Sequence, residues 1–568
     1  MDKVLPGPEQ AKIDANYLRG TVAEELNNDE AAFSKATTAV LKFHGMYQQD
    51  DRDLRKAGPK QVSAMVRVGV PGGVLKPDQY LALDRLSDIG NGTLRITTRQ
   101  DIQYHSVPKV RVRELIQGIN ENYLTTLAAC GDVVRNVIAC PAPFEDEQRH
   151  QLQPVVQFIA RSLKPRSKAY YEIWVDGTKV ETPEAEVPQG EVEPLYGATY
   201  LPRKFKIGFA FAGDNTTDVY ANDVGIVPHY EAGELKAFTI LAGGGMGQSA
   251  GVKASHPRMA DPICSIGPTK EELLEVCSAI VSIHRDFGNR INRRLARLKY
   301  VLDAWGVDKF KTELETRVGR TLAPPRPLTW TRAADYLGWH RQGTDNTGEA
   351  IWFVGVRVLS GRVKDFDESL RIRTGLRTIV ERFRTEVRLT CQQNLYLSGI
   401  RDADRRAVAA LLREHGIAEP ESLPPVLRHA LACPALPTCG LAITEAERIM
   451  PELVASVQRE LDAARLREQP VDLRITGCPN GCARPYTAEI GIVGSSLDMY
   501  TIYLGASPLG TRMGEVFATN VKRNEIAPRL RPLFESYRET RQRGETFGDY
   551  CDRVGIEALK ELVVLAAA

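Results

Sequence analysis

Four cysteines carry the strongest chemical signal in the sequence. Cys433 and Cys439 enclose five residues, and Cys478 and Cys482 follow as a second pair that encloses three. Four thiolates can hold a zinc ion or a [4Fe-4S] cluster. Zinc sites favour closer pairs with two to four intervening residues, so the first pair suits zinc less well. The spacing therefore favours a cluster and leaves zinc open.

Basic residues recur in stretches that are otherwise apolar. Lys204 and Lys206 are two residues apart, so on a strand they lie on the same side. Arg67 and Arg135 sit in other apolar stretches. Taken singly, each is more often a solvated surface residue. Together they could bind a small oxyanion and a polycarboxylate cofactor, because arginine grips such groups in a bidentate manner and lysine can also transfer a proton.

The elements that must position these residues are repeated along the chain. Residues 94–104 match residues 387–397 with one offset (95 to 388, 97 to 390, 100 to 393), and residues 139–142 match 432–435 with the same offset. Each copy predicts the order strand, turn, helix, strand, helix, with final helices over 110–119 and 402–412. A constant offset across separated motifs indicates an internal duplication.

Composition excludes several classes of protein. The 568 residues are 43% hydrophobic and 26% charged, with a net charge of +2, which argues against global disorder, a nucleic-acid coat or a polybasic membrane binder. No apolar stretch approaches the ~20 residues of a membrane span, and the start does not look like a signal peptide. We expect a cytoplasmic protein, in which clustered cysteines are metal ligands or redox groups.

Four motifs give the sequence a family resemblance. They are Ala15–Gly20, Phe43–Asp53, Leu201–Lys206 and Thr476–Cys482. Over nearly the whole chain the sequence resembles the siroheme-containing sulfite and nitrite reductases. The stretch Phe43–Asp53 favours the assimilatory branch of hemoprotein (beta) components that work with an NADPH-dependent diflavin reductase.

The resemblance implies a role for each site residue. Cys433, Cys439, Cys478 and Cys482 would ligate the [4Fe-4S] cluster, and Cys482 would also bridge it to the siroheme iron. The residues that would bind and protonate the oxyanion are Arg67, Arg135, Lys204 and Lys206. The residues that would surround the siroheme are Arg95, Arg99, Gln103, His105, Gln393, Asn394 and Asn480.

The predicted fold is α/β (α+β), internally duplicated, with a pseudo-twofold arrangement. Residues 61–140 and 331–420 would be paired ferredoxin-like half-domains. Residues 141–330 and 421–568 would be larger α/β domains, for siroheme and substrate and for cluster and siroheme. Residues 1–60 would be an N-terminal arm, a possible partner-docking element, and the acidic, proline-rich residues 181–193 a surface loop.

The predicted activity is the six-electron reduction of sulfite to sulfide. No flavin or NADPH site is apparent, so electrons would come from a diflavin NADPH reductase in a hetero-oligomer, with no nucleic-acid or membrane partner. A siroheme nitrite reductase and a ferredoxin-dependent sulfite reductase are the alternatives within the family. A non-catalytic protein stabilised by zinc or an iron–sulfur cluster is the alternative outside it.

Overall fold

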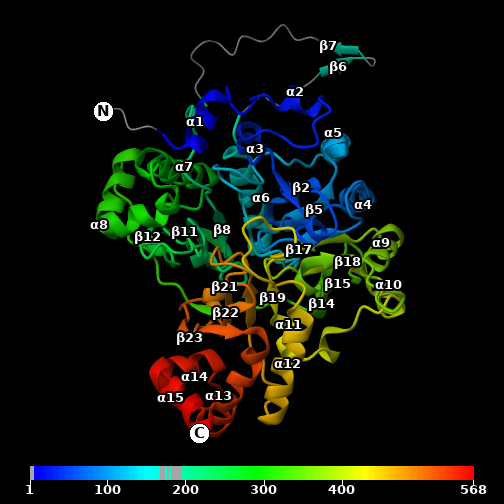
Figure 1. Ribbon diagram of the computed structural model, residues 1–568, viewed down its shortest axis with the longest axis vertical. Coiled ribbons are helices and arrows are strands. Elements are labelled where there is room, and N and C mark those ends of the chain that lie inside the picture. The colour runs from blue at the N-terminus through cyan, green and yellow to red at the C-terminus, as the bar shows by residue number, and fades with distance from the viewer. Residues whose placement is uncertain (1–4, 167–172, 176–177, 181–192, 568) are drawn as a thin grey trace.

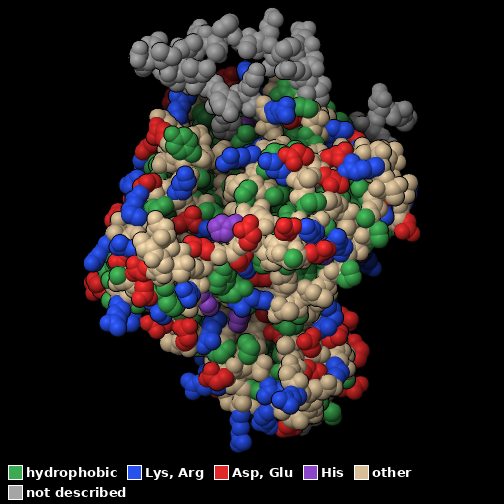
Figure 2. Space-filling view, turned by 180° about the vertical axis from the view of Figure 1, so that it is seen from behind, with side chains coloured by type: hydrophobic (Ala, Val, Ile, Leu, Met, Phe, Trp, Pro, Cys, Tyr) green, Lys and Arg blue, Asp and Glu red, His purple; other side chains and the backbone are tan. Residues whose placement is uncertain are grey.

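The computed structural model describes residues 5–166, 173–175, 178–180 and 193–567. Apart from Glu193, the predicted surface loop lies outside the described residues. Within the described chain, no helix is long and apolar enough to cross a membrane. On the face that Figure 2 shows, positive and negative side chains are interspersed, as the small net charge suggests.

Two five-stranded antiparallel sheets form the centre of the molecule (Figure 1). The first has the order β1-β2-β5-β4-β16 and the second has the order β14-β15-β18-β17-β3. The strands of the first are β1 (Met46–Asp50), β2 (Val62–Val68), β5 (Ile102–Val107), β4 (Leu94–Ile96) and β16 (Arg362–Val363). Those of the second are β14 (Gly338–Thr344), β15 (Ala350–Val356), β18 (Leu395–Arg401), β17 (Glu386–Leu389) and β3 (Val74–Leu75).

The two sheets exchange their edge strands. β3 comes from the first copy of the repeat but pairs with β17, and β16 comes from the second copy but pairs with β4. Each exchanged strand follows a tight turn that ends in a glycine with positive φ, Gly73 or Gly361. A Cβ at these positions would lie 2.4 Å from the Leu389 carbonyl oxygen and 2.2 Å from that of Ile96, so only glycine allows the two copies to approach this closely.

Two helices accompany each sheet and bury their apolar faces against it. They are α4 (Pro77–Leu86) and α5 (Val112–Glu121) in the first copy, and α9 (Ile372–Phe383) and α10 (Asp402–Glu414) in the second. The two predicted final helices are confirmed, and the predicted order holds with two additions: the short strands β3 and β16 precede the first helices, and each of the stretches 94–104 and 387–397 contains two strands joined by a turn. The apolar side chains of both copies belong to one continuous core, so the two ferredoxin-like half-domains stabilise each other by shared burial.

The third unit is a four-stranded sheet with three long helices. Its order is β12-β11-β10-β8, and the short β8 runs parallel to β10. The strands are β8 (Ile207–Phe209), β10 (Val224–Glu231), β11 (Glu234–Ala242) and β12 (Asp261–Ile266), and the helices are α6 (Glu147–Ser162), α7 (Lys270–Phe287) and α8 (Leu298–Val318). Two-stranded pairings add β9 (Gly213–Asp214) with β13 (Trp330–Arg332), and β6 (Ile173–Val175) with β7 (Thr178–Val180).

The C-terminal unit has a comparable core. Its sheet runs β19-β20-β21-β22-β23, with the first three strands parallel. The strands are β19 (Leu431–Ala432), β20 (Leu473–Thr476), β21 (Ile490–Ser496), β22 (Met499–Leu504) and β23 (Glu515–Lys522). The helices are α11 (Pro425–His429), α12 (Met450–Ala463), α13 (Ile526–Thr540), α14 (Phe547–Val554) and α15 (Ile556–Ala567).

The N-terminal segment is built into the molecule. It forms α1 (Gly7–Asp14), α2 (Val22–Leu26), α3 (Lys35–Leu41) and then β1. On α1, the buried Glu9 and Lys12 join Asp132 and Arg293 in a network of ion pairs. The first sheet therefore begins at Met46, inside the segment that the sequence assigned to an arm. The strand was missed because Met-Tyr-Gln-Gln-Asp is too polar to show a buried face.

Candidate active site

The four cysteines meet at one edge of the C-terminal sheet. Cys433 follows β19, while Cys478 and Cys482 follow β20. Because β19 and β20 are parallel neighbours, their carboxyl ends lie together, and the amide of Cys433 donates to the Ile475 carbonyl at 3.2 Å. Cys439 lies in the loop that follows Cys433, so all four thiols come to one place.

The thiols interact electrostatically with one another. Burial raises the pKa of Cys433 well above its ordinary value, and Cys482, Cys478 and Cys439 raise it further. Burial and then Cys482 also raise the pKa of Cys478, to about 11. Among the described residues, no three His, Cys, Asp or Glu side chains are arranged to hold one metal ion, as a zinc site would require.

Hydrogen-bond donors lie next to the sulfurs of Cys433 and Cys478. The amide of Gly477 lies 3.3 Å from Cys433 Sγ, and the Asn480 side-chain amide lies 3.5 Å from Cys478 Sγ. Such hydrogen bonds stabilise thiolate charge. Asn480, which the resemblance placed near siroheme, therefore contacts a predicted cluster ligand.

Lys204 and Lys206 flank a buried phenylalanine in an extended segment. Phe205 is fully buried, whereas both lysines are half-buried, as expected when they lie on the same side. The segment is not a regular strand: Phe205 forms an isolated parallel bridge to Val134. Arg135 follows Val134, and its amide donates to the Phe205 carbonyl at 2.8 Å. The predicted cations Arg135, Lys204 and Lys206 therefore come from adjacent backbone segments.

Positive charge is concentrated around the two lysines. Burial and then Arg203 and Arg297 lower the pKa of Lys204 to about 7, and Cys482 acts in the opposite direction. Burial, together with nearby cations, holds the pKa of Lys206 well below its ordinary value. No carboxylate in the described chain pairs with either ammonium group. An anion that binds here would restore both charges.

Arg67 joins this group from β2. Burial opposes its charge, but Cys130, Asp101 and Cys482 outweigh burial and raise the pKa of Arg67 above its ordinary value. On the adjacent β5, the Gln103 amide is oriented with its oxygen 3.1 and 2.5 Å from Nε and Nη2 of Arg67. Cys482 thus lies within electrostatic reach of three predicted anion-binding residues and favours the charged form of each: Arg67, Lys204 and Lys206.

His105, also on β5, has no partner for either ring nitrogen in the described part of the chain, although both are buried. Burial, and then Arg362, Arg95 and Arg67, hold the pKa of His105 well below its ordinary value, so the ring is neutral. A buried ring without partners is costly unless a ligand supplies them.

Two predicted periphery arginines are held by the protein. Arg95 on β4 forms an ion pair with Glu447 and donates to the Ala432 carbonyl at 2.9 Å, next to Cys433. Arg99 donates to the Asn222 side chain and to the carbonyls of Asn136 and Ile207. Only its buried Nε lacks a partner among the described residues. Both arginines therefore brace backbone that lies beside site residues.

Gln393 and Asn394, the predicted siroheme-periphery residues of the second copy, differ in their hydrogen bonding. Gln393 has a buried Oε1 with no partner in the described chain. Asn394 accepts from Arg357 at 2.7 Å and donates to Asp335 at 2.8 Å. The polar groups of Asn394 are thus committed within the second half, and Gln393 keeps an acceptor available.

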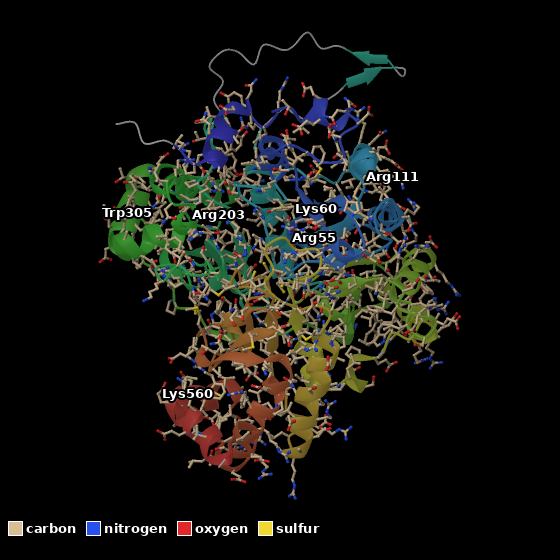
Figure 3. The ribbon with its side chains drawn as sticks, in the orientation of Figure 1. Arg55, Lys60, Arg111, Arg203, Trp305 and Lys560 are labelled. Atoms are coloured by element: carbon tan, nitrogen blue, oxygen red, sulfur yellow. The ribbon has the colours of Figure 1, made fainter. Side chains whose placement is uncertain are left out.

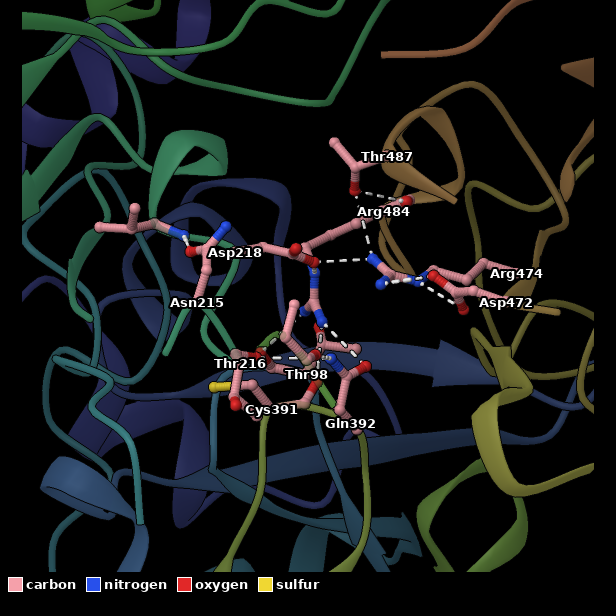
Figure 4. Close-up of polar contacts among 12 residues, drawn as sticks. Thr98, Asn215, Thr216, Asp218, Cys391, Gln392, Asp472, Arg474, Arg484 and Thr487 are labelled. Atoms are coloured by element: carbon pink, nitrogen blue, oxygen red, sulfur yellow. Dashed lines mark hydrogen bonds and ion pairs between the residues drawn. The ribbon is translucent and has the colours of Figure 1, made fainter. Parts of the chain in front are cut away.

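A central ion pair was missed from the sequence (Figure 4). Arg484, two residues after Cys482, pairs with Asp218 and donates to the carbonyls of Thr98 at 3.3 Å and Cys391 at 3.0 Å. The Thr98 hydroxyl donates to the Cys482 carbonyl at 3.0 Å. Thr98 and Cys391 are equivalent in the repeat, so Arg484 joins both copies to the Cys482 loop. A signal was available: Asp218 lies five residues before Asp223–Val227, and Arg484, of opposite charge, lies five residues before the similar stretch Glu489–Val493.

The residues present fit the two expected cofactors. Four neighbouring thiols with amide donors suit a [4Fe-4S] cluster. Siroheme carries eight carboxylates, which would match the unpaired cations and the orphaned nitrogens of His105 and Arg99. Another buried hydroxyl without a partner in the described chain, that of Thr476, lies two residues before Cys478.

Comparisons with known proteins agree with this assignment. The family model "Nitrite and sulphite reductase 4Fe-4S domain" matches residues 157–322 and 425–567. The model "Nitrite/Sulfite reductase ferredoxin-like half domain" matches residues 58–122 and 344–415. Both models match twice, as the internal duplication requires.

Similar proteins match nearly the whole chain and carry one activity name. A "Sulfite reductase [ferredoxin]" of Synechococcus elongatus is 42% identical over 97% of this chain and 90% of its own. A "Sulfite reductase [NADPH] hemoprotein beta-component" of Shewanella piezotolerans is 42% identical over 98% of this chain and 97% of its own. The protein of that name from Geobacillus kaustophilus is 41% identical over 96% and 95%.

A solved structure supports the same fold. The NirA protein of Mycobacterium tuberculosis superimposes with a TM-score of 0.77 at 24% identity and covers 98% of both chains. The match extends over the half-domains and the two larger units together. The chain belongs to the nitrite and sulfite reductase family, whose sulfite-reducing hemoproteins carry siroheme and a [4Fe-4S] cluster.

Proposed function

We propose that the protein is the hemoprotein subunit of a sulfite reductase and reduces sulfite to sulfide with six electrons. The observation that carries this proposal is that Arg67, Lys204 and Lys206, from separate segments of the fold, all lie within electrostatic reach of Cys482. When bound, siroheme coupled to the cluster supplies the substrate-binding iron and single electrons. The names of the similar proteins support sulfite as the substrate.

The four cations would divide two tasks. Arg67 and Arg135 would hold the oxyanion and strengthen their hydrogen bonds as the S–O bonds polarise. Lys204 and Lys206 would deliver protons, because sulfite loses its three oxygens as water. The pKa of Lys204, about 7 without ligands, suits a proton donor near neutral pH, and bound anions would raise it.

For the electron donor we propose a diflavin NADPH reductase, bound in a hetero-oligomer in the cytoplasm. The Phe43–Asp53 motif and the Shewanella and Geobacillus relatives support it. A ferredoxin is the second candidate, because the equally similar Synechococcus protein is named for that donor. Turnover with each donor in parallel separates the two.

The first experiment is a visible spectrum of protein loaded with both cofactors, followed by sulfite turnover with a chemical reductant. We expect a Soret band, a red-shifted band and a spectral change on adding sulfite. Lys204→Met should keep these bands and lower turnover by about 10²-fold, the size of a general-acid contribution. Loss of siroheme in this variant would make Lys204 a cofactor anchor. A higher kcat/KM for nitrite than for sulfite would reassign the substrate.

A further inference from the structure

The segment after β1 lies directly on the loop that holds Cys439. The amide of Arg52 donates to the Pro437 carbonyl at 3.3 Å. Its guanidinium donates from Nη2 to the Cys439 carbonyl and from Nη1 to the Ala442 carbonyl, both at 3.0 Å. Arg52 therefore binds the backbone on both sides of Cys439, at Pro437 and at Ala442. It does so from a part of the sequence that is remote from the cysteines.

Arg52 has no carboxylate partner in the described chain, unlike its neighbours. Arg55 and Lys60, labelled in Figure 3, share Asp50 at 2.5 and 3.5 Å. Arg448, which lies nearby on the C-terminal unit, pairs with Asp53 at 2.5 Å. The positive charge on Arg52 is thus balanced only by carbonyl dipoles.

The position of this charge matters because Cys439 is itself only partly buried. Leu441, two residues further on, is 69% exposed, so this side of the cysteine group lies near the surface. The reduction potential of an iron–sulfur cluster depends on nearby charge and on solvent exposure. Each electron adds one negative charge to the cluster and breaks no bond, so an unneutralised cation favours the reduced state.

We propose that Arg52 is a positioning residue that fixes the Cys439 loop and raises the reduction potential of the cluster bound there. The proposal rests on the proposed function, because it requires a [4Fe-4S] cluster at the four cysteines. It gives the N-terminal segment a part in electron uptake that is independent of which donor binds.

The test compares the cluster potential in three variants of the full-length, cofactor-loaded protein. Iron, acid-labile sulfide and siroheme absorbance are measured first, and the potential is then measured by a redox titration followed by electron paramagnetic resonance. Arg52→Gln should shift the potential to more negative values. Arg52→Lys, which keeps the charge, should stay near the wild type. Arg55→Gln, which removes an exposed and paired arginine three residues away, is the matched control and should leave the potential unchanged.

Several outcomes would overturn the proposal. One is an Arg52→Gln protein with full iron and an unchanged potential, and another is an equal shift in Arg55→Gln. A shift in Arg52→Lys as large as in Arg52→Gln would show that charge is not the cause. If Arg52→Gln loses its cluster, the potential is measured in Asp53→Asn instead. Removal of this carboxylate should raise the potential, and an unchanged potential would overturn the proposal. Wild-type protein that takes up no cluster would instead overturn the proposed function.

Discussion

Arg67 lies in β2 and Arg357 directly follows β15, the corresponding strand of the second copy, but the two arginines have different surroundings. The Arg357 side chain donates to the Asn394 oxygen and to the carbonyls of Val358, Leu427 and Ala430. Burial lowers its pKa to about 10. The Arg67 side chain donates to Gln103 alone within the described chain and lies within electrostatic reach of Cys482. Near the end of this strand, the second copy uses an arginine to brace backbone, and the first copy keeps one for a ligand.

Asp101 of the first copy and Asn394 of the second show the same contrast between an unpaired and a fully paired side chain. Asn394 is saturated by Arg357 and Asp335. Asp101 leaves Oδ1 buried without a partner in the described chain, and burial raises its pKa to about 6 although Arg67 opposes the rise. A buried network is stable when every polar atom is paired. The network of Arg357, Asn394 and Asp335 meets this condition, and the Asp101 carboxylate does not.

The largest difference between the two copies should appear when the cysteines at the equivalent positions 433 and 140 are replaced by serine. Cys433→Ser should abolish cluster binding and sulfite turnover, because it removes one of four thiolates. Cys140→Ser should keep both, because the Cys140 thiol donates to Asp214 at 3.6 Å and is not one of the four predicted cluster ligands. Iron and sulfide analysis with the visible spectrum measures this. A Cys433→Ser protein with four irons per siroheme would contradict the ligand assignment.

The two arginines should separate activity from stability. Arg67→Met should lower kcat/KM for sulfite about 10²- to 10³-fold, the loss typical of one oxyanion donor, with little change in unfolding. Arg357→Met should destabilise the protein by about 3 kcal/mol, because four buried acceptors lose their donor. Urea denaturation and steady-state kinetics measure both. Equal losses of activity and of stability in the two variants would contradict the assignment of Arg67 to the ligand and of Arg357 to the backbone.

A smaller effect concerns pH. β8 and β20 correspond, because each runs parallel to the long strand β10 or β21 of its unit. Lys204 lies three residues before β8, whereas Pro470 lies three residues before β20, so the pH effect should come from the first copy alone. In protein without cofactors, the ammonium of Lys204 is charged below its pKa of about 7 and loses its proton above it. Sulfate affinity should therefore be constant below pH 7 and fall by up to about tenfold per pH unit above it. Calorimetric titration measures the slope, which Lys204→Met should flatten; an equal slope in that variant would exclude Lys204 as its source.

The sequence was informative where a signal was local or repeated. The cysteine spacing, the constant offset and the alternation around Phe205 led to the cluster residues, the duplication and the lysine pair. It could not show that Arg95 and Arg99 bind backbone, because residue type does not reveal a partner. It could not show the exchange of β3 and β16 either, because strands of two residues have no pattern of their own. Arg52 lay in a recognised motif, and only the fold brings it to Cys439.

The exchanged strands make the two copies mutually dependent. A single copy, produced alone, would leave the edge of β4 or β17 open and would expose half of a shared core. Two identical copies could close each other's sheets as a swapped dimer, and joining them end to end would preserve every contact. Fusion then frees each copy to change alone, which is how one could lose its ligand site while the other kept it.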